Sequence, residues 1–295
     1  NRVWRHTRRI CLPCSTNRVT RKKAKQSEND YKHKRSPVHC LNGLGFLVLQ
    51  AKMFQKAIAQ YNKQAEQPFA PKVVLFDMDG VLYNSMPNHA KAWQRAMAEF
   101  GIDFTAEDAY ATEGARGVDT VRKYAKVQLG KELTEDEAEE MYQLKAHYFH
   151  EMPTTDIFDG VKDLMQKIQD SGLKIGIVTG SGQRQLINRL LSDFKDFINE
   201  AQVTTAFDVK RGKPNPDPYL IGLQKAGNFA PHEGIVVENA PLGVRAGVAA
   251  GCFTVAINSG PLPDTALLSE GANILFDTIS DFSNSWEQLM TCCNQ

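Results

Sequence analysis

The chain has 295 residues, enough for one large domain or for a core with a smaller second domain, and its 42% share of hydrophobic residues is ordinary for a globular protein. No apolar run approaches the roughly 18 residues of a membrane-spanning helix, so we expect no membrane insertion. The net charge of +1 hides an asymmetry: residues 1–52 hold 13 Lys or Arg and 2 acids, whereas the remainder holds 22 basic and 32 acidic residues.

The basic front end differs in character from the rest of the chain. We expect residues 1–66 to lack stable structure, because they show no sustained hydrophobic period and have little to bury. An Arg-rich leader could be a transit peptide, and a basic arm could bind nucleic acid. The preferred interpretation is upstream sequence outside the working protein, with Met53 as the natural start and no nucleic-acid partner. A zinc site is a fourth alternative, although its spacing fits no standard motif; its ligands would be Cys11, Cys14, His33 and Cys40.

The six cysteines do not form the pattern of a disulfide framework, so a reducing cytoplasm is the expected compartment. From Pro71 onward, short apolar runs alternate with stretches of helical length. This alternation predicts a doubly wound α/β fold with a parallel sheet. The runs expected to form buried strands are 72–76, 173–178, 234–237, 253–257 and 273–276.

One block breaks the alternation of strands and helices. Three helices are expected, at 88–100, 118–129 and 134–150, and the third begins with a capping box formed by Thr134 and Glu137. An all-helical block after the first strand predicts a cap domain inserted into the core. The expected boundaries are 85–152 for the cap and 67–84 with 153–295 for the core, with hinges near Asn84 and Met152-Pro153.

Polar side chains follow several of the predicted strands, where ligands of open α/β sheets bind. Asp77 and Asp79 come directly after the first strand, and Gly80 permits a turn that aims both carboxylates at one site. Two carboxylates beside a buried strand are costly without a cation, and their oxygen atoms suit Mg²⁺. The alternative is a solvated turn.

The next two strand ends offer groups that bind phosphate. Thr179, Gly180 and Ser181 lead into a helix, so their hydroxyls and backbone N–H groups could cradle an anion; the alternative is an ordinary helix cap. Lys213 is followed by three prolines in five positions, which hold its backbone rigid and could present the ammonium to a phosphoryl oxygen. A surface lysine beside a helix start is the alternative.

A fourth strand end carries Glu238 and Asn239, which are plausible metal ligands or simply the cap of a helix that starts near Pro241. The four segments, FDMDGVL, IVTGSG, KPNPDPY and VVENAPLGVRAG, resemble in their order the motifs of the haloacid dehalogenase superfamily. The resemblance covers about residues 72–290 and is closest to the β-phosphoglucomutase-like branch, which includes phosphatases and a pyrophosphatase group. His89 and Trp93 match positions that follow the first motif in that branch.

The resemblance implies a mechanism. Asp77 would attack phosphorus and form an aspartyl-phosphate, and Asp79 would act as general acid and base. Thr179 and Lys213 would hold the transferring phosphoryl group. Mg²⁺ would be bound by Asp77, by the Asp79 backbone carbonyl and by the region of Glu238 and Asn239. Asn239 departs from the family pattern, which often has Asp there.

The expected substrate loop of the cap contains Glu113 and Arg116. Arg116 lies one position away from the arginine that would hold the second phosphate of a phosphosugar in a mutase. Glu113 would repel a second phosphate unless it reaches Mg²⁺, where it would replace the charge missing at Asn239. We therefore expect a phosphatase for a small phosphorylated substrate such as inorganic pyrophosphate. A phosphosugar mutase and a regulatory or nucleic-acid-binding protein are the alternatives.

Overall fold

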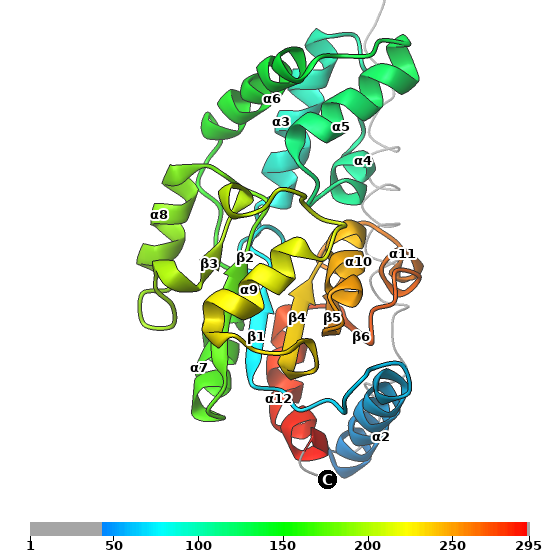
Figure 1. Ribbon diagram of the computed structural model, residues 1–295, viewed down its shortest axis with the longest axis vertical. Helices are drawn as coiled ribbons and strands as arrows, with labels where there is room; N and C mark the ends of the chain where they lie inside the picture. The colour runs from blue at the N-terminus through cyan, green and yellow to red at the C-terminus, as the bar shows by residue number, and fades with distance from the viewer. Residues whose placement is uncertain (1–42, 294–295) are drawn as a thin grey trace, which may run out of the picture. The chain divides into compact units, whose positions relative to one another are not determined.

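The computed structural model describes residues 43–293. The chain divides into two units, residues 1–47 and 48–295, and the described part of the first is the helical backbone of residues 43–47. Figure 1 shows the helices and strands of the second unit. The zinc ligands considered from the sequence lie outside the described residues. Within residues 43–293, no helix combines the length and the apolar character required to cross a bilayer.

The core is a six-stranded parallel sheet with the strand order β3-β2-β1-β4-β5-β6. The five strands predicted from apolar runs are confirmed, and the sixth is the two-residue β3, which pairs with the end of β2. The centre of the sheet is completely buried, as short runs rich in Val and Ile require. The strands are β1 Val73–Phe76, β2 Lys174–Val178, β3 Val203–Thr204, β4 Gly234–Glu238, β5 Phe253–Ile257 and β6 Ile274–Phe276.

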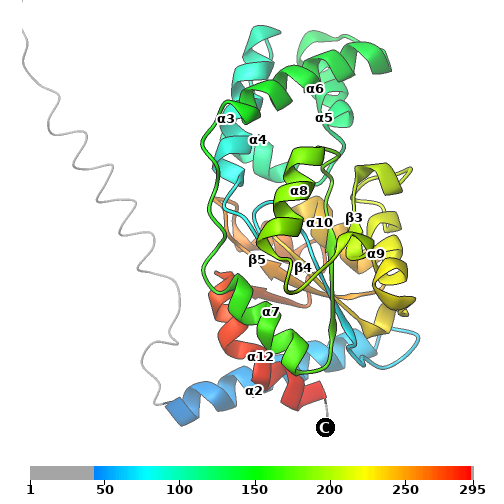
Figure 2. The ribbon, with the colours of Figure 1, turned by 90° about the vertical axis from the view of Figure 1, so that its left-hand side faces the viewer.

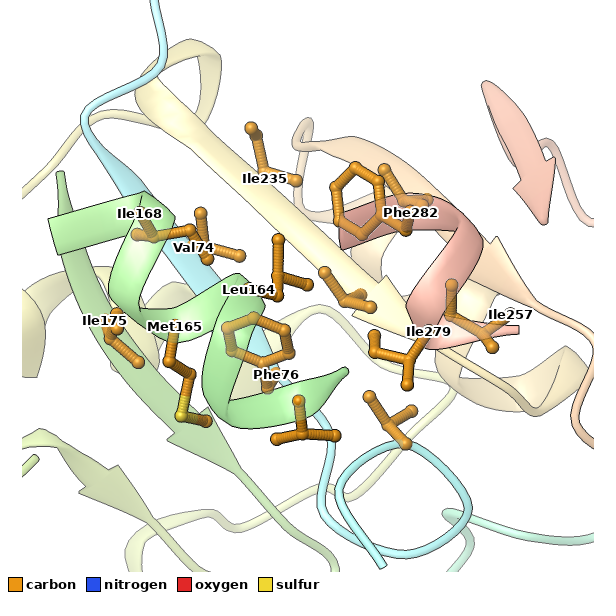
Figure 3. Packing of buried hydrophobic residues seen from close by; sticks show 14 of the residues in the cluster. Val74, Phe76, Leu164, Met165, Ile168, Ile175, Ile235, Ile257, Ile279 and Phe282 are labelled. Atoms are coloured by element: carbon orange, nitrogen blue, oxygen red, sulfur yellow. The ribbon is translucent and has the colours of Figure 1, made fainter. Parts of the chain in front are cut away.

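Helices cover both faces of the sheet, which confirms the doubly wound fold (Figure 2). In Figure 3, α7 and α12 pack on one face, where Leu164, Met165 and Phe282 lie against Val74 and Phe76. Helices α9 and α10 cover the other face. The core helices are α7 Val161–Asp170, α8 Arg184–Asp193, α9 Asp217–Gly227, α10 Pro241–Ala249, α11 Asp264–Leu268 and α12 Ile279–Cys293, and the 3-10 turns are η3 Glu200–Gln202, η4 Ala206–Asp208 and η5 Pro231–Glu233.

The helical block between β1 and β2 has a hydrophobic core of its own, formed by residues such as Trp93, Phe104, Val121 and Met141. The capping box of Thr134 and Glu137 is present. The predicted helix 118–129 is an α-helix followed by one π-helical turn, and a short helix at 106–111 was not predicted. The elements are α3 Met86–Glu99, α4 Ala106–Ala111, α5 Gly117–Tyr124, η2 Ala125–Leu129 and α6 Glu135–His150. We call residues 85–152 the cap and the remainder of the unit the core.

The expectation that residues 1–66 lack structure is wrong for α2, which spans Gly43–Asn62. Phe54, Ala57 and Tyr61 recur at a spacing of three and four residues and lie on one face of the helix, where all three are buried in the core. The Tyr61 hydroxyl donates to the carbonyl of Gly251 at 2.6 Å. The helix therefore forms because its apolar face packs on the domain, despite the basic segment before it.

Candidate active site

A buried lysine joins the ends of β1 and β4. Lys213 Nζ donates to Asp77 Oδ1 at 2.5 Å and to Glu238 Oε1 at 2.6 Å, and it lies 3.3 Å from the carbonyl oxygen of Val178 at the end of β2. The three side chains are all nearly inaccessible to solvent. The sequence prediction that these strand ends converge is thus confirmed for Asp77, Lys213 and Glu238.

Glu238 has a full set of hydrogen-bond partners. Besides Lys213, its carboxylate accepts the Tyr219 hydroxyl at 2.6 Å and the backbone N–H groups of Asn239 and Ala240 at 3.0 and 3.3 Å. A methyl group added at Gly243 would lie 1.9 Å from Glu238 Oε1, so the glycine of the following helix makes room for the carboxylate. These contacts orient Glu238 toward the lysine.

Burial and pairing with an opposite charge have opposite effects on the pKa values of Asp77 and Lys213. Burial, together with the neighbouring Glu238 carboxylate, raises the pKa of Asp77 well above its usual value, although Lys213 opposes the shift. Burial alone would lower the pKa of Lys213, but the charges of Asp77 and Glu238 raise it. Lys213 therefore stays an ammonium group in a site that excludes water.

Asp79 is held by a second chain of hydrogen bonds, which comes from the cap. Asp79 Oδ1 accepts the Ser85 hydroxyl at 2.6 Å and lies 3.2 Å from His89 Nε2. Lys145 Nζ lies 2.7 Å from His89 Nδ1. An ammonium can only donate, so Nδ1 accepts from Lys145 and Nε2 carries the hydrogen that points to Asp79.

This chain keeps Asp79 ionised. Burial alone would raise the pKa of Asp79, but His89, then the Ser85 hydroxyl and the Lys145 ammonium, hold it below its usual value. Burial lowers the pKa of Lys145, and Glu113 and Asp79 partly oppose that shift. The Lys145 ammonium also lies 5.2 Å from the ring centre of Trp93. Trp93, predicted as a cap residue of the site, therefore supports the buried lysine.

Sequence reasoning missed Ser85 and Lys145. A signal for Lys145 was present, because it lies in line with Ala138, Met141 and Phe149 on the buried stripe of α6. A lysine in such a stripe needs a partner in the interior. Ser85 reads as a helix cap before Pro87, yet its side chain caps no backbone group and is used for Asp79.

The predicted phosphate-binding segment lies beside Lys213. The Thr179 hydroxyl accepts the backbone N–H of Ser181 at 3.0 Å, which shapes the turn before α8. Thr179, Gly180 and Lys213 together line one cavity of about 20 Å³. The structure thus brings Thr179, Gly180, Ser181 and Lys213 together, as predicted, while their role in binding phosphate stays a prediction.

Asn239 is the most unusual polar residue of the site. Both polar atoms of its side-chain amide are buried and have no hydrogen-bond partner among residues 43–293. A methyl group added at Gly80, where φ is +85°, would lie 2.1 Å from Asn239 Nδ2, so the turn after β1 brings the backbone against this amide. A buried amide oxygen without a hydrogen-bond partner, close to carboxylates, is a suitable ligand atom for a hard cation.

The charges of the site also fit a cation. Four acidic side chains and two lysines meet in this region, so acidic groups outnumber basic ones. Within the described chain, no cluster of three His, Cys, Asp or Glu side chains forms a ready-made metal site. A cation here would need amide or backbone oxygens besides the carboxylates, and Asn239 supplies such a group. The charged residues are Asp77, Asp79, Glu113, Glu238, Lys145 and Lys213.

Cap and core enclose a small pocket next to Asp79, which we call the acceptor pocket; its volume is about 40 Å³. Glu113 lies half-buried in this pocket, and burial raises its pKa, although His89, Lys145 and Lys213 oppose the shift. The lining consists of Asp79, His89, Trp93, Thr112, Glu113, Gly114, Ala115, Gly117, Thr120, Tyr142, Lys145, Gly180, Ser181 and Gln183.

Arg116 is not part of the acceptor pocket. Its guanidinium group donates two hydrogen bonds to Asp119, both 2.8 Å long, and is partly exposed. It lines the neighbouring cavity of Thr179 and Lys213 instead. Of the cap residues predicted for the site, the structure places His89, Trp93 and Glu113 in the acceptor pocket and leaves Arg116 outside it.

A buried aspartate at the end of the first strand thus lies beside a lysine and the turn before α8, and a helical cap lies over them. The sequence profile of the haloacid dehalogenase-like hydrolase family matches residues 74–257, and the chain belongs to this family. The predicted superfamily is thus confirmed, and the chain is an enzyme of the haloacid dehalogenase phosphatase type.

Individual relatives agree with this assignment. Hexitol phosphatase A of Escherichia coli K12 is 33% identical over 68% of this chain and 88% of its own length. Pyrophosphatase PpaX of Bacillus pumilus is 27% identical over 70% of this chain and 93% of its own. A solved structure from Bacteroides vulgatus, provisionally named a β-phosphoglucomutase, is 45% identical, with a TM-score of 0.78 over 83% of this chain and all of that one.

Proposed function

We propose that the protein is a Mg²⁺-dependent phosphohydrolase that acts through an aspartyl-phosphate on a small phosphorylated substrate, with inorganic pyrophosphate as the best candidate. The observation that carries the proposal is the position of the cations around the acceptor pocket. Arg116 is bound to Asp119 outside the pocket, and Lys145 within it is hydrogen-bonded to His89, so neither is placed to hold the second phosphate of a phosphosugar.

The residues support a two-step transfer. Asp77 Oδ attacks phosphorus, and the bond from phosphorus to the leaving oxygen breaks as Lys213 and Thr179 hold the phosphoryl oxygens. In the second step, Asp79 accepts a proton from water, which attacks the aspartyl-phosphate and releases inorganic phosphate and free Asp77. Asp79 would return that proton to the next leaving group.

The lowered pKa of Asp79 keeps its carboxylate ionised and able to accept a proton, and it also makes that carboxylate a weaker base. A phosphate leaving group is far less basic than a sugar alkoxide and needs little help from an acid. A diphosphate substrate therefore suits an Asp79 that is mostly ionised. His89 and Lys145 come from the cap, so Asp79 would have this hydrogen-bond chain only while the cap is closed.

Mg²⁺ would be held by Asp77, by the Asp79 backbone carbonyl, by the Asn239 side chain and by Glu113 from the cap. Bound there, the cation would neutralise charge on the phosphoryl oxygens and lessen their repulsion by Asp77. Glu238 is a weaker candidate ligand than the sequence suggested, since Lys213, Tyr219 and two backbone N–H groups already use its oxygens. We assign it to the orientation of Lys213.

The second candidate is a phosphosugar mutase, and the observation in its favour is the name of the similar Bacteroides vulgatus structure. A mutase needs a cation that holds the second phosphate of a bisphosphate. Arg116 is bound to Asp119 and lies outside the acceptor pocket, and Lys145, which lines the pocket, is hydrogen-bonded to His89. The hydrolase is therefore preferred.

The test is turnover of the purified full chain with Mg²⁺ against inorganic pyrophosphate, sorbitol 6-phosphate, glucose 6-phosphate and β-glucose 1-phosphate. We expect phosphate release from pyrophosphate to have the highest kcat/KM. Interconversion of β-glucose 1-phosphate and glucose 6-phosphate in the presence of β-glucose 1,6-bisphosphate should be slower. Isomerisation faster than any hydrolysis would establish the mutase instead.

A further inference from the structure

Two segments connect the core to the cap, and they lie side by side. The backbone N–H of Asn84 donates to the carbonyl of Asp156, and the N–H of Phe158 donates to the carbonyl of Leu82, both at 2.9 Å. Tyr83 forms a bridge with Ile157 in antiparallel fashion. We call residues 82–84 and 155–158 the hinge ribbon, because the chain leaves the core for the cap just after the first segment and re-enters the core just before the second.

Side chains of α8 contact both segments of the hinge ribbon. The Tyr83 hydroxyl donates to Asp193 Oδ2 at 2.9 Å, and Arg189 Nε donates to the same oxygen at 3.2 Å. The Arg189 guanidinium lies 4.4 Å from the ring centre of Tyr83 and donates through Nη2 to the carbonyl of Thr155. One arginine thus contacts one residue from each connection between core and cap.

The same helix begins at the phosphate-binding turn. Helix α8 starts at Arg184, directly after Thr179–Gln183, and Arg189 and Asp193 lie about one and a half and two and a half turns further along it. The turn and the hinge contacts are therefore parts of one rigid element. The Arg189 and Asp193 side chains are about 30% exposed and line neither of the two cavities of the site, so substrate contact does not explain them.

The cap is closed in this structure. A methyl group added at Gly114 of the cap would lie 2.9 Å from Lys213 Cδ of the core, and His89 reaches Asp79. We propose that Arg189 and Asp193 form a hinge clamp that stabilises this closed position and couples it to phosphate held by the turn before α8. Arg189 is then a positioning residue, which acts through Tyr83 and Thr155 on the cap.

A rotation of the cap that moves Tyr83 or Thr155 relative to α8 would break a hydrogen bond to a charged group. Phosphate bound at the start of α8 would fix the helix and favour the clamped ribbon. Loss of the hinge clamp should therefore make the hinge ribbon more mobile and weaken the binding of ligands that need the closed cap.

The experiment compares Arg189→Met, which keeps the aliphatic length, with Arg184→Met on the same helix, whose exposed guanidinium pairs with Glu200 at 3.9 Å. Hydrogen exchange of the full chain is followed at the Asn84 and Phe158 amides. Affinity for inorganic phosphate with Mg²⁺ is measured by calorimetry. For Arg189→Met we expect exchange at both amides to rise at least tenfold and phosphate affinity to fall at least fivefold.

In steady-state kinetics, Arg189→Met should raise KM with less than a twofold change in kcat, and Arg184→Met should change neither. Unchanged exchange, or faster exchange with unchanged phosphate affinity, would overturn the proposal. An equal rise at the β1 amides would show global destabilisation and would overturn it too. If Arg189→Met does not fold, Tyr83→Phe removes only the hydroxyl that binds Asp193 and should act in the same direction. The kinetic arm rests on the proposed function, but exchange and phosphate binding do not require turnover.

Discussion

Replacing Glu238 by glutamine tests whether Glu238 is a buried carboxylate whose hydrogen bonds and ion pair stabilise the fold. The substitution keeps the shape of the side chain but turns one acceptor atom into a donor. If the remaining oxygen faces Lys213 and Tyr219, the new amide nitrogen meets the N–H groups of Asn239 and Ala240. If the amide is reversed, the nitrogen meets the two side-chain donors instead. Either way, two buried donors lose their acceptor.

Each such loss costs about 1–3 kcal/mol, and removing one partner of a buried ion pair typically costs about 3–5 kcal/mol. We therefore expect Glu238→Gln to lower the free energy of unfolding by about 3–5 kcal/mol, with a Tm lower by roughly 6–20 °C for a unit of this size. Urea unfolding followed by circular dichroism gives the first value, and a calorimetric scan gives the second.

The matched control is Glu270→Gln. Glu270 accepts two hydrogen bonds from Arg245, at 2.6 and 2.7 Å, but Arg245 is half-exposed. An ion pair that solvent reaches is worth about 0–1 kcal/mol, so the control should lose no more than that. A loss below about 1 kcal/mol in Glu238→Gln, equal to the control, would refute the assignment of Glu238 as a fully bonded buried carboxylate.

Three further predictions concern the reaction. Asp77→Asn should abolish turnover while urea unfolding stays cooperative, because an amide cannot attack phosphorus; appreciable residual turnover in clean protein would exclude Asp77 as the nucleophile. His89→Ala removes a donor that favours ionised Asp79, so the pKa of Asp79 should rise and the acidic limb of the kcat–pH profile should move to higher pH; the exposed His147→Ala is the control, and an unmoved limb would contradict the hydrogen-bond chain. Glu113→Ala should raise the Mg²⁺ concentration for half-maximal turnover and relax discrimination against sugar phosphates; an unchanged Mg²⁺ dependence and substrate profile would remove Glu113 from the site.

Sequence reasoning located the elements that carry a strong local signal. The buried strands could be read from runs of Val and Ile, and α6 could be read from its capping box. The edge strand β3 has two residues, too few for any periodicity. Helix α4 has six residues and begins with a capping box of Thr105 and Asp108, which was the one signal available. Helix α2 was missed because its basic flank outweighed the spacing of its apolar residues.

The site shows the same division. Asp77, Thr179 and Glu238 could be found because each comes at the end of a strand of a parallel sheet, where chain order determines position, and Lys213 could be found from the prolines that follow it. The partner of a side chain is a tertiary property, however. Nothing local indicates that Lys145 reaches His89 across the cap. The pairing of Arg116 with Asp119 did have a local signal, the i,i+3 spacing, but the sequence does not show that this pairing keeps Arg116 out of the acceptor pocket.

The two lysines of the site belong to different parts of the unit, Lys213 to the core and Lys145 to the cap, and this has an evolutionary consequence. Lys213 belongs to the core and is locked between carboxylates, so its replacement should endanger folding as well as chemistry. The cap has a separate hydrophobic core, and it presents Glu113 and Lys145 to the pocket from its own helices and loop. Substitutions in the cap can therefore be sampled by selection with little penalty to the core. New substrates can arise through changes in the cap that spare His89, Lys145 and Glu113, while Asp77 and Lys213 of the core are kept.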